Sequence, residues 1–462
     1  MADLSPTVFV LYGATGDLAA RMVLPAFDQL ERRGLLPPDW RLVGSGRGER
    51  SDDDFRGLVR DALSEHGDGE PADGLLDRLR FAGGGFTPED PGQLVDAVAA
   101  AREELGGDAQ LVHYLAVPPG AFEGITRGLD AHGLAAGARV VFEKPYGTSP
   151  DAFRELDELV HSVLDEEQVF RIDHFLGKEG TQDLHVLRFA NGLFSSVWSR
   201  EHVAQVQIDV PETLDVADRA EFYDATGATL DMLVTHLFQV AAEVAMEPPV
   251  SLRPADLQEA REAVLAAFRP LAREDVVLGQ FEGYRDLDDV PDDSRTDTFV
   301  AARLWVDTDR WRDVPFLLRT GKRMAEGHQR VTLVMKRPDG PAGPTPGGGN
   351  TVSLSLSGAG ELDLGLVTKR PGPDLEMAVA EATLDLGKVD GGQPLPAYAS
   401  LIHDVLVGDR SLFTTGAGLE QAWRAVRPVL DAPPEVQPYA PGSWGPEDAQ
   451  ALADPCGWVL GS

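Results

Sequence analysis

The stretch Val8-Phe9-Val10-Leu11-Tyr12-Gly13-Ala14-Thr15-Gly16-Asp17-Leu18 joins an apolar run to a glycine turn, and an amphipathic segment follows it to about Arg33. Apolar runs separated by helical stretches recur through the first third of the chain, which indicates parallel strands with crossover helices. The further runs expected to be strands are 41–43, 111–117, 139–142 and 169–172. The sequence therefore predicts an α/β, Rossmann-like, doubly wound domain over residues 1–178.

After about residue 180 the pattern changes to alternating segments, which are typical of an antiparallel sheet with one covered face. Strands are predicted over 203–210, 299–305, 331–335 and 351–356, and helices over 228–246, 255–268 and 418–426, the last ending before Pro428. Pro338 to Gly349 is predicted to be a hairpin loop and Pro433 to Pro446 an irregular tail. We expect a larger α+β domain with a mainly antiparallel sheet over residues 179–462.

Composition and charge exclude some classes of binding partner and indicate where the protein is located. The 462 residues suit two or three domains, and 41 basic against 76 acidic residues give a net charge of −35. Nucleic acid and anionic membranes need a basic surface, so neither is an expected partner. The start carries no apolar leader, no eighteen apolar residues run together, and Cys456 is the one cysteine. We expect a cytoplasmic protein without a disulfide or a cysteine metal site.

The glycine turn places backbone amides at a helix N-terminus, where a pyrophosphate can bind. Its G-x-x-G spacing also occurs in ordinary strand-to-helix connections, so the turn alone leaves both interpretations open. After the next predicted strand, Ser45 and Arg47 stand where a carboxylate would read the ribose of NAD. A hydroxyl and a guanidinium suit a 2′-phosphate, which favours NADP over NAD, although Arg47 also fits a solvated loop. The candidate cofactor residues are Gly13, Thr15, Gly16, Asp17, Leu18, Ser45 and Arg47.

The segment from Arg171 to Glu179 ends the last predicted parallel strand, at the edge where doubly wound sheets bind ligands. Adjacent residues of an extended strand point to opposite faces, so we expect Asp173 and His174 to have different roles. If a helix begins there, His174 and Lys178 share one face and form a cationic pair that can hold a phosphate. The alternative is a buried structural histidine beside a surface lysine.

Several motifs occur in the order found in one enzyme family. They are Gly13-Ala14-Thr15-Gly16-Asp17-Leu18-Ala19, Glu143-Lys144-Pro145-Tyr146-Gly147, Arg171 to Glu179, Phe222-Tyr223-Asp224, Val314-Pro315-Phe316, Arg319-Thr320-Gly321-Lys322 and Tyr439 to Pro446. On these motifs the chain resembles glucose-6-phosphate dehydrogenase along nearly its whole length. Fold and ancestry alone do not fix a substrate.

The resemblance implies oxidation of C1 of glucose 6-phosphate by NADP, with no metal because the hydride leaves to a nicotinamide. It makes His236 the base and Asp173 its carboxylate partner. It also makes Glu212 and Asp231 acceptors for the sugar hydroxyls, and Lys144 and Lys322 donors to the sugar and the cofactor. His174 and Lys178 would hold the substrate phosphate. The family is expected to form a homodimer, or a tetramer of dimers, through the sheet of the second domain.

The chain departs from the family pattern at six positions, which are Ala20, Phe175, Glu221, Phe222, Thr235 and, with an uncertain alignment, Gly327. Phe175 replaces a tyrosine beside the phosphate grip and cannot donate a hydrogen bond. The alternatives are therefore a relative that acts on free glucose or on another hexose 6-phosphate, and an inactive homologue with a regulatory role. A broader sugar oxidoreductase family also carries the Glu-Lys-Pro triplet, but usually with G-x-G-x-x-G and a shorter chain.

Overall fold

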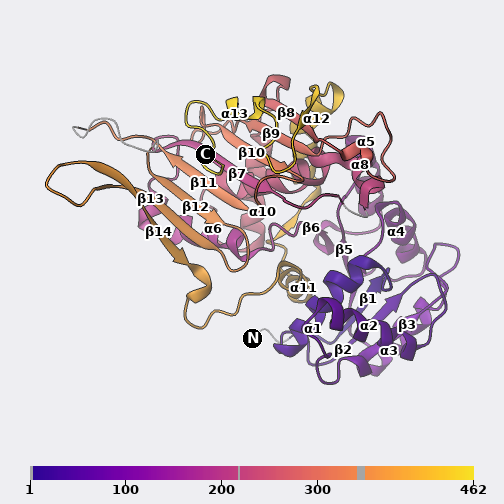
Figure 1. Cartoon of the computed structure of the whole chain (residues 1–462). Coiled ribbons are helices and arrows are strands. Elements are labelled where there is room, and N and C mark those ends of the chain that lie inside the picture. The colour runs from indigo at the N-terminus through magenta and orange to yellow at the C-terminus, as the bar shows by residue number, and fades with distance from the viewer. Residues whose placement is uncertain (1–3, 217–218, 341–348, 462) are drawn as a thin grey trace. The chain divides into compact units, whose positions relative to one another are not determined.

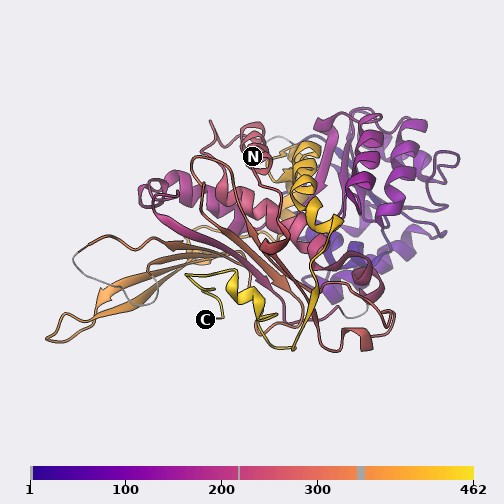
Figure 2. The ribbon, with the colours of Figure 1, turned by 90° about the horizontal axis from the view of Figure 1, so that it is seen from above.

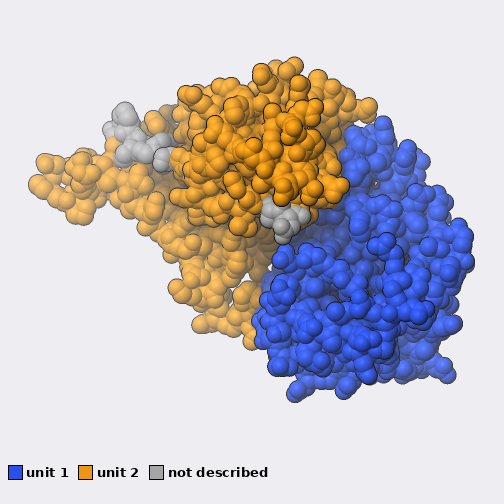
Figure 3. All heavy atoms as spheres, turned by 45° about the vertical axis from the view of Figure 1, so that its right-hand side comes forward, with its two compact units in different colours: residues 1–177, 253–258, 395–416 blue, residues 178–252, 259–394, 417–462 orange. Residues whose placement is uncertain are grey.

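The computed structural model describes residues 4–216, 219–340 and 349–461. The chain forms two compact units, which Figure 3 colours separately. Unit 1 comprises residues 1–177, 253–258 and 395–416, and unit 2 comprises 178–252, 259–394 and 417–462. The first boundary between the units, after residue 177, lies beside the expected boundary after residue 178. Segments 253–258 and 395–416 also belong to unit 1, so the units differ from the contiguous ranges 1–178 and 179–462.

Unit 1 contains a seven-stranded sheet in the order β15-β6-β5-β4-β1-β2-β3 (Figure 1). Strands β1 to β6 pair in parallel, which confirms the predicted doubly wound sheet. Their bounds are β1 Thr7–Tyr12, β2 Trp40–Ser45, β3 Leu79–Ala82, β4 Gln110–Leu115, β5 Arg139–Phe142 and β6 Val169–Ile172. The strand order reverses between β1 and β4, and such a reversal opens a ligand crevice at the carboxyl ends of the strands.

The crossover segments of unit 1 are helical. The π-helix η1 (Ala19–Val23) continues into α1 (Leu24–Arg32), and α2 (Asp52–His66), α3 (Leu94–Glu104), α4 (Phe122–Ala131) and α5 (Pro150–His161) follow. The core on the α1 and α2 side includes Phe9, Phe27, Trp40 and Phe55, all nearly inaccessible to solvent. This packing fixes where each strand ends, and therefore where the loops at the carboxyl edge begin.

A segment from the last part of the chain completes unit 1. Helix α11 (Ala397–Val407) packs on α1, and the short strand β15 (Phe413–Thr414) pairs antiparallel with β6. β6 is the last parallel strand, as expected, but β15 continues the sheet beyond it. The pairing joins residues that are about 240 positions apart, and local sequence patterns carry no signal for such a partner.

Unit 2 contains a nine-stranded sheet in the order β14-β13-β12-β11-β7-β10-β9-β8-β16. The pairs β7–β10 and β8–β16 are parallel and the other pairs are antiparallel, which confirms a mainly antiparallel sheet. The bounds are β7 Val203–Pro211, β8 Val276–Phe281, β9 Phe299–Leu304, β10 Phe316–Gly321, β11 Arg330–Met335, β12 Thr351–Ser355, β13 Glu361–Lys369, β14 Met377–Asp385 and β16 Val436–Tyr439.

Helices cover one face of this sheet and the C-terminal segment covers the other (Figure 2). The helices of unit 2 include α6 Glu179–Ala190, α7 Gly192–Ser195, α8 Ala220–Ala228, the π-helix η6 Thr229–Leu237, α9 Phe238–Ala245, most of α10 Pro254–Ala266, α12 Gly416–Asp431 and α13 Asp448–Ala451. Among the described residues, no helix is both long enough and apolar enough to cross a membrane.

Two expectations about proline were wrong. Helix α12 continues through Pro428 to Asp431. A proline inside a helix removes one amide donor and usually kinks the helix, but it does not have to end it. The expected irregular tail contains β16, in which Pro438 lies on the edge of the sheet, where strands tolerate proline. The predicted hairpin loop 338–349 lies mostly outside the described residues.

Candidate active site

The glycine turn after β1 lies against the end of β4. Gly13 has a φ of +71°, and a Cβ at this position would overlap the carbonyl oxygen of Ala116. The amide of Gly16 donates to the Gly13 carbonyl at 2.9 Å, which closes the turn before the helix. Thr15, Gly16 and Asp17 are exposed, and Leu18 is half-buried. The turn therefore presents its amides at the reversal of the strand order, as a dinucleotide site requires.

The end of β2 is tied to the same turn. The amides of Gly13 and Ala14 donate to the carbonyl of Ser45 at 3.0 and 3.2 Å. Ser45 is buried, and Arg47 is exposed two residues further on. The structure thus brings together the candidate cofactor residues of β1 and β2, which lie about thirty positions apart in the chain.

A buried carboxyl precedes Lys144 at the end of β5. Tyr114 donates to Glu143 Oε1 at 2.6 Å, and the Lys144 amide donates to Glu143 Oε2 at 3.3 Å. Burial raises the pKa of Glu143, although these hydrogen bonds oppose the rise. Glu143 therefore fixes the backbone of Lys144 at the carboxyl edge of the sheet, and the Lys144 side chain is half-buried.

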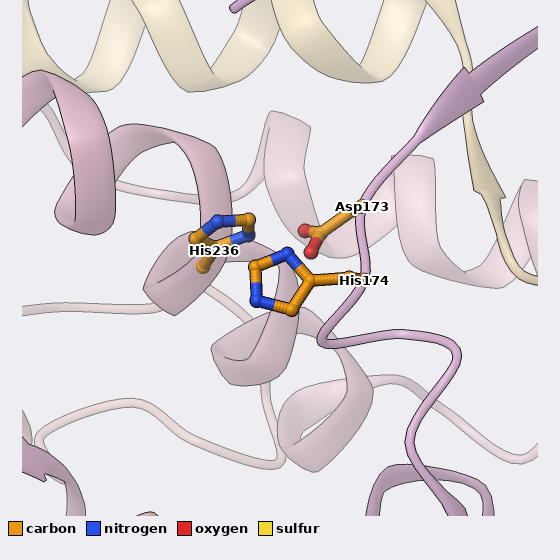
Figure 4. Close-up of side chains that lie close together, drawn as sticks. All are labelled: Asp173, His174 and His236. Carbon is orange, nitrogen blue, oxygen red and sulfur yellow. The ribbon is translucent and has the colours of Figure 1, made fainter. Parts of the chain in front are cut away.

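Asp173 and His174 lie on the turn that follows β6 (Figure 4). The Asp173 side chain is 1% exposed, and its Oδ1 accepts from the Phe175 amide at 2.9 Å. The His174 ring stacks on Tyr398, with 6.3 Å between the ring centroids. A ring nitrogen of His174 lies within 4.8 Å of a carboxylate oxygen of Asp173. The strand ends at Ile172 and the backbone turns there, so the two side chains come close together and do not lie on opposite faces of a strand.

Arg171 fixes the end of β6. It is 1% exposed and donates to both carboxylate oxygens of Glu166 at 3.0 Å and to Asp157 at 2.7 Å. Arg410 also donates to Glu166, at 2.6 Å. Burial alone would raise the pKa of Glu166, but the charges of Arg171 and Arg410 outweigh it and lower that pKa. This ion-pair network holds the strand two residues before Asp173.

Lys178 belongs to unit 2, where it directly precedes α6. Its Nζ donates to Oε1 of Gln329. Helix α6 begins at Glu179, after a turn over residues 174–177. The expectation that His174 and Lys178 share one helical face is therefore wrong. Sequence analysis also missed Gln329, which lies about 150 positions from Lys178.

Glu212 and Lys322 follow two adjacent parallel strands. Asp209 of β7 is in register with Arg319 of β10, and Arg319 Nε donates to Asp209 Oδ1 at 2.6 Å. Glu212 and Lys322 are the first residues after these two strands, and Lys322 Nζ donates to Glu212 Oε2 at 2.7 Å. The Glu212 amide also donates to the Gly321 carbonyl at 2.9 Å. The parallel register thus brings together two candidates that are 110 positions apart.

Tyr223 of α8 connects these two residues with Asp231. The Nζ of Lys322 lies 5.6 Å from the centre of the Tyr223 ring. Burial raises the pKa of Tyr223 well above its ordinary value, and the charges of Asp231, Asp297 and Glu212 raise it further. Lys322, which is paired with Glu212, therefore lies beside a buried tyrosine of the motif Phe222-Tyr223-Asp224, and the charge of Asp231 acts on the same tyrosine.

His236 lies on helix η6 and is completely buried (Figure 4). The helix begins after Gly227, which has a φ of +63°, and a Cβ there would overlap the Asp297 carboxylate. Asp297 Oδ2 accepts from the amide and the hydroxyl of Thr229, both at 2.8 Å. Asp297 therefore fixes the first turn of the helix that carries His236. No sequence pattern links Asp297 to that helix, so sequence analysis missed it.

The close fit of Gly227 against Asp297 predicts the effect of adding a methyl group. Gly227→Ala is expected to lower the free energy of unfolding by about 1–3 kcal/mol more than Gly358→Ala does, because overpacking adds to the strain of a positive φ. Gly358 is the control, since its φ is +59° and nothing lies within 4 Å of the place that an added methyl group would take. Urea unfolding of both variants measures the difference, and equal losses would contradict the role of Asp297.

Comparison with known proteins identifies the family. The family model for the NAD binding domain of glucose-6-phosphate dehydrogenase matches residues 10–183, and the model for its C-terminal domain matches residues 185–458. "Glucose-6-phosphate 1-dehydrogenase 2" of Mycobacterium tuberculosis is 37% identical over 96% of this chain and 92% of its own length. "Glucose-6-phosphate 1-dehydrogenase 6, cytoplasmic" of Arabidopsis thaliana is 33% identical over 97% of this chain and 91% of its own length. A solved glucose-6-phosphate dehydrogenase in complex with glucose 6-phosphate superposes with a TM-score of 0.90 at 27% identity and full coverage of both chains. The chain therefore belongs to the glucose-6-phosphate dehydrogenase family.

Proposed function

We propose that this chain oxidises the C1 hydroxyl of glucose 6-phosphate to 6-phosphogluconolactone, with NADP as the hydride acceptor. The observation that carries the proposal is the match of both family domains over nearly the whole chain, together with candidate residues at the carboxyl ends of β1, β5, β6, β7 and β10. The product is the one expected of the first oxidative step of the pentose phosphate pathway.

His236 acts as the general base and takes the proton of the C1 hydroxyl. An imidazole titrates near neutrality, which suits a base that must accept and then release a proton. Asp173 orients the imidazole and stabilises its protonated form. Two features support these roles, namely the complete burial of His236 and the hydrogen bond that fixes the Asp173 carboxylate to the Phe175 amide.

Unit 2 supplies groups for the sugar. Glu212 and Asp231 accept hydrogen bonds from sugar hydroxyls, and Lys322 donates one from its place beside Glu212. Lys144 of unit 1 donates to the sugar and to the cofactor side. His174 and Lys178 hold the phosphate, since ionised donors form the stronger hydrogen bonds to phosphate oxygens.

The turn after β1 fits a dinucleotide, because its backbone passes so close to β4 that Gly13 leaves no room for a Cβ. Gly13, Thr15, Gly16, Asp17 and Leu18 hold the pyrophosphate at the start of the helix. Ser45 and Arg47 then hold the 2′-phosphate of NADP. When bound, the nicotinamide accepts the hydride that leaves C1.

The chain assembles as a homodimer, or a tetramer of dimers, through the sheet of unit 2. Strands β13 and β14 form one end of that sheet and extend from it as a long hairpin (Figure 1). This hairpin exposes the apolar side chains of Leu366, Leu375, Val379 and Leu384. Exposed apolar groups on an edge strand favour burial against a second copy. We also propose a cytoplasmic location, which the name of the Arabidopsis relative supports.

The role of His236 predicts a loss of turnover. His236→Asn is expected to lower kcat by roughly 10²–10⁴-fold with little change in KM, because it removes a proton acceptor and not a binding group. Asp173→Asn should lower kcat to a smaller degree. His202→Asn, which changes an exposed histidine before β7, is the control. If His236→Asn keeps more than about a tenth of the kcat, another residue is the base.

The substrate phosphate provides the second test. Glucose 6-phosphate should be used better than glucose, and Lys178→Ala should reduce the ratio of kcat/KM for the two sugars strongly. Phe175→Tyr should widen that ratio by roughly tenfold or less, about 1 kcal/mol, because it adds one neutral donor. Lys388→Ala, which removes an exposed lysine paired with Asp385, is the control. Equal use of both sugars, or an unchanged ratio in Lys178→Ala, would favour a free-sugar dehydrogenase instead.

The cofactor assignment predicts a selective loss. Arg47→Ala should weaken the use of NADP by about 1.5–3 kcal/mol and leave the use of NAD nearly unchanged, because only NADP carries the 2′-phosphate. Arg50→Ala removes a neighbouring exposed arginine and serves as the control. The measurement is KM and kcat/KM for both nucleotides, and an equal loss with both would overturn the assignment.

A further inference from the structure

Unit 2 contains a cavity that is separate from every candidate residue described above. It has a volume of about 470 Å³ and lies between α6, the segment around α7 and the loop that follows α9. Its walls include Arg188, Phe189 and Trp198, and Arg310 reaches it from the segment after β9. This volume is within the range of pockets that bind small molecules.

The guanidinium of Arg188 is buried in the wall of this cavity, with the residue only 2% exposed. Its two Nη atoms donate to backbone carbonyls, those of Glu243 at 2.7 Å and Met246 at 2.5 Å. Within the described residues, its Nε has no hydrogen-bond partner and no carboxylate lies within ion-pair distance. Neutral carbonyls orient this charge but do not neutralise it.

The carboxylate of Glu243 is already used by other groups. His185 Nε2 bonds to its Oε2, and Arg261 Nε donates to its Oε1. Burial alone would raise the pKa of Glu243, but Arg261 and His185 outweigh it and lower the pKa to about 2. The buried Glu243 carboxylate is therefore paired with neighbours other than Arg188.

A second cation lines the same cavity. Arg310 donates to Glu247 Oε2 at 2.8 Å and to the Trp198 carbonyl at 3.0 Å. Burial and the charge of Arg310 together lower the pKa of Arg188 to about 9, against the opposing charges of Glu243 and Glu247. The cavity therefore carries an excess of positive charge, although the chain as a whole has a net charge of −35.

Apart from His185, Ser195 and Ser251, the other residues that line the cavity are apolar or aromatic. The rings of Phe189 and Trp198 flank the Arg188 guanidinium, at 4.7 and 5.4 Å from their centres. Val186 and Leu252 also line the cavity and are 52% and 55% exposed. Exposed apolar groups around a concave site favour a ligand with an apolar body. A bare inorganic ion would leave these groups in water.

We propose that this cavity binds a small organic anion with an aromatic or branched apolar body, whose anionic group is held by Arg188 and Arg310. The site is independent of the proposed catalytic function, since none of the candidate catalytic, sugar or cofactor residues lines it. A ligand here would supply the missing charge beside Arg188 and cover the apolar rim.

Anilinonaphthalene sulfonate is a suitable probe, because it joins an aromatic body to one anionic group and becomes fluorescent in apolar sites. The full-length chain is titrated with it in two separate runs, one with saturating NADP and one with saturating glucose 6-phosphate, because the two together would react. Each substrate keeps the probe out of its own part of the catalytic site. We expect about one bound probe per chain. Phenylnaphthylamine, which has a similar body without the charge, should bind more weakly.

Four variants locate the binding. Arg310→Met should weaken the probe roughly tenfold or more, because one charged donor is lost. Ser195→Trp, at an exposed position in the cavity wall, should abolish binding by filling the space. Glu247→Gln should strengthen binding, because it releases Arg310 from its carboxylate partner. Arg312→Met, which removes an exposed arginine outside the cavity, should change nothing.

The proposal fails if either substrate alone prevents the probe from binding, or if the probe binds equally to wild type and to Ser195→Trp. It also fails if Arg310→Met and Arg312→Met have the same effect. These results do not depend on turnover, so the loss of the proposed activity would leave this test intact.

Discussion

The buried ion pair between Asp209 and Arg319 is the constraint on which the substrate side of unit 2 depends. Both residues lie at the centre of the nine-stranded sheet, on the parallel pair β7 and β10, and both are almost completely buried. Arg319 also stacks on Trp458 at 4.0 Å and donates to the Leu460 carbonyl, so the same guanidinium holds the C-terminal segment against the sheet. Loss of one partner from such a pair typically costs about 3–5 kcal/mol. A slip of one residue between the strands would break this pair and separate Lys322 from Glu212.

Buried charged or polar contacts also fix the backbone near other candidate residues. Arg171, held by Glu166 and Asp157, ends β6 two positions before Asp173. Asp297 fixes the start of η6, seven positions before His236. In each case a buried charged or polar contact sets the end of a regular element, and the candidate side chain lies a few residues beyond it. Such contacts are costly unless they are fully satisfied, which makes the backbone at these points well defined.

Sequence patterns predicted the elements but not the contacts between distant ones. Five of the six parallel strands, four of the nine strands of unit 2 and the long helix around His236 follow from apolar periodicity, whereas β3, β8, β10, β13, β14 and β16 were not predicted. Nothing local signals that β15 pairs with β6, that β7 and β10 run parallel, or that Asp297 caps η6, because each joins segments that are about 70 to 240 positions apart. The helical spacing assumed for His174 and Lys178 failed for a local reason, since the turn over 174–177 delays the start of α6. The family resemblance made Glu212 and Lys322 candidates, although no periodicity links the two, and the structure brings them together.

The charge of the chain explains how its cations are arranged. At a net charge of −35, a cation that is meant for an anionic ligand attracts the protein's own carboxylates first. Lys322 accordingly pairs with Glu212, and Arg310 pairs with Glu247. Arg188 differs from these two residues, because its guanidinium is held by neutral groups, namely backbone carbonyls and aromatic rings. Neutral partners preserve the charge that an acidic surface would otherwise cancel, and this is why a cavity in so acidic a chain can still attract an anion.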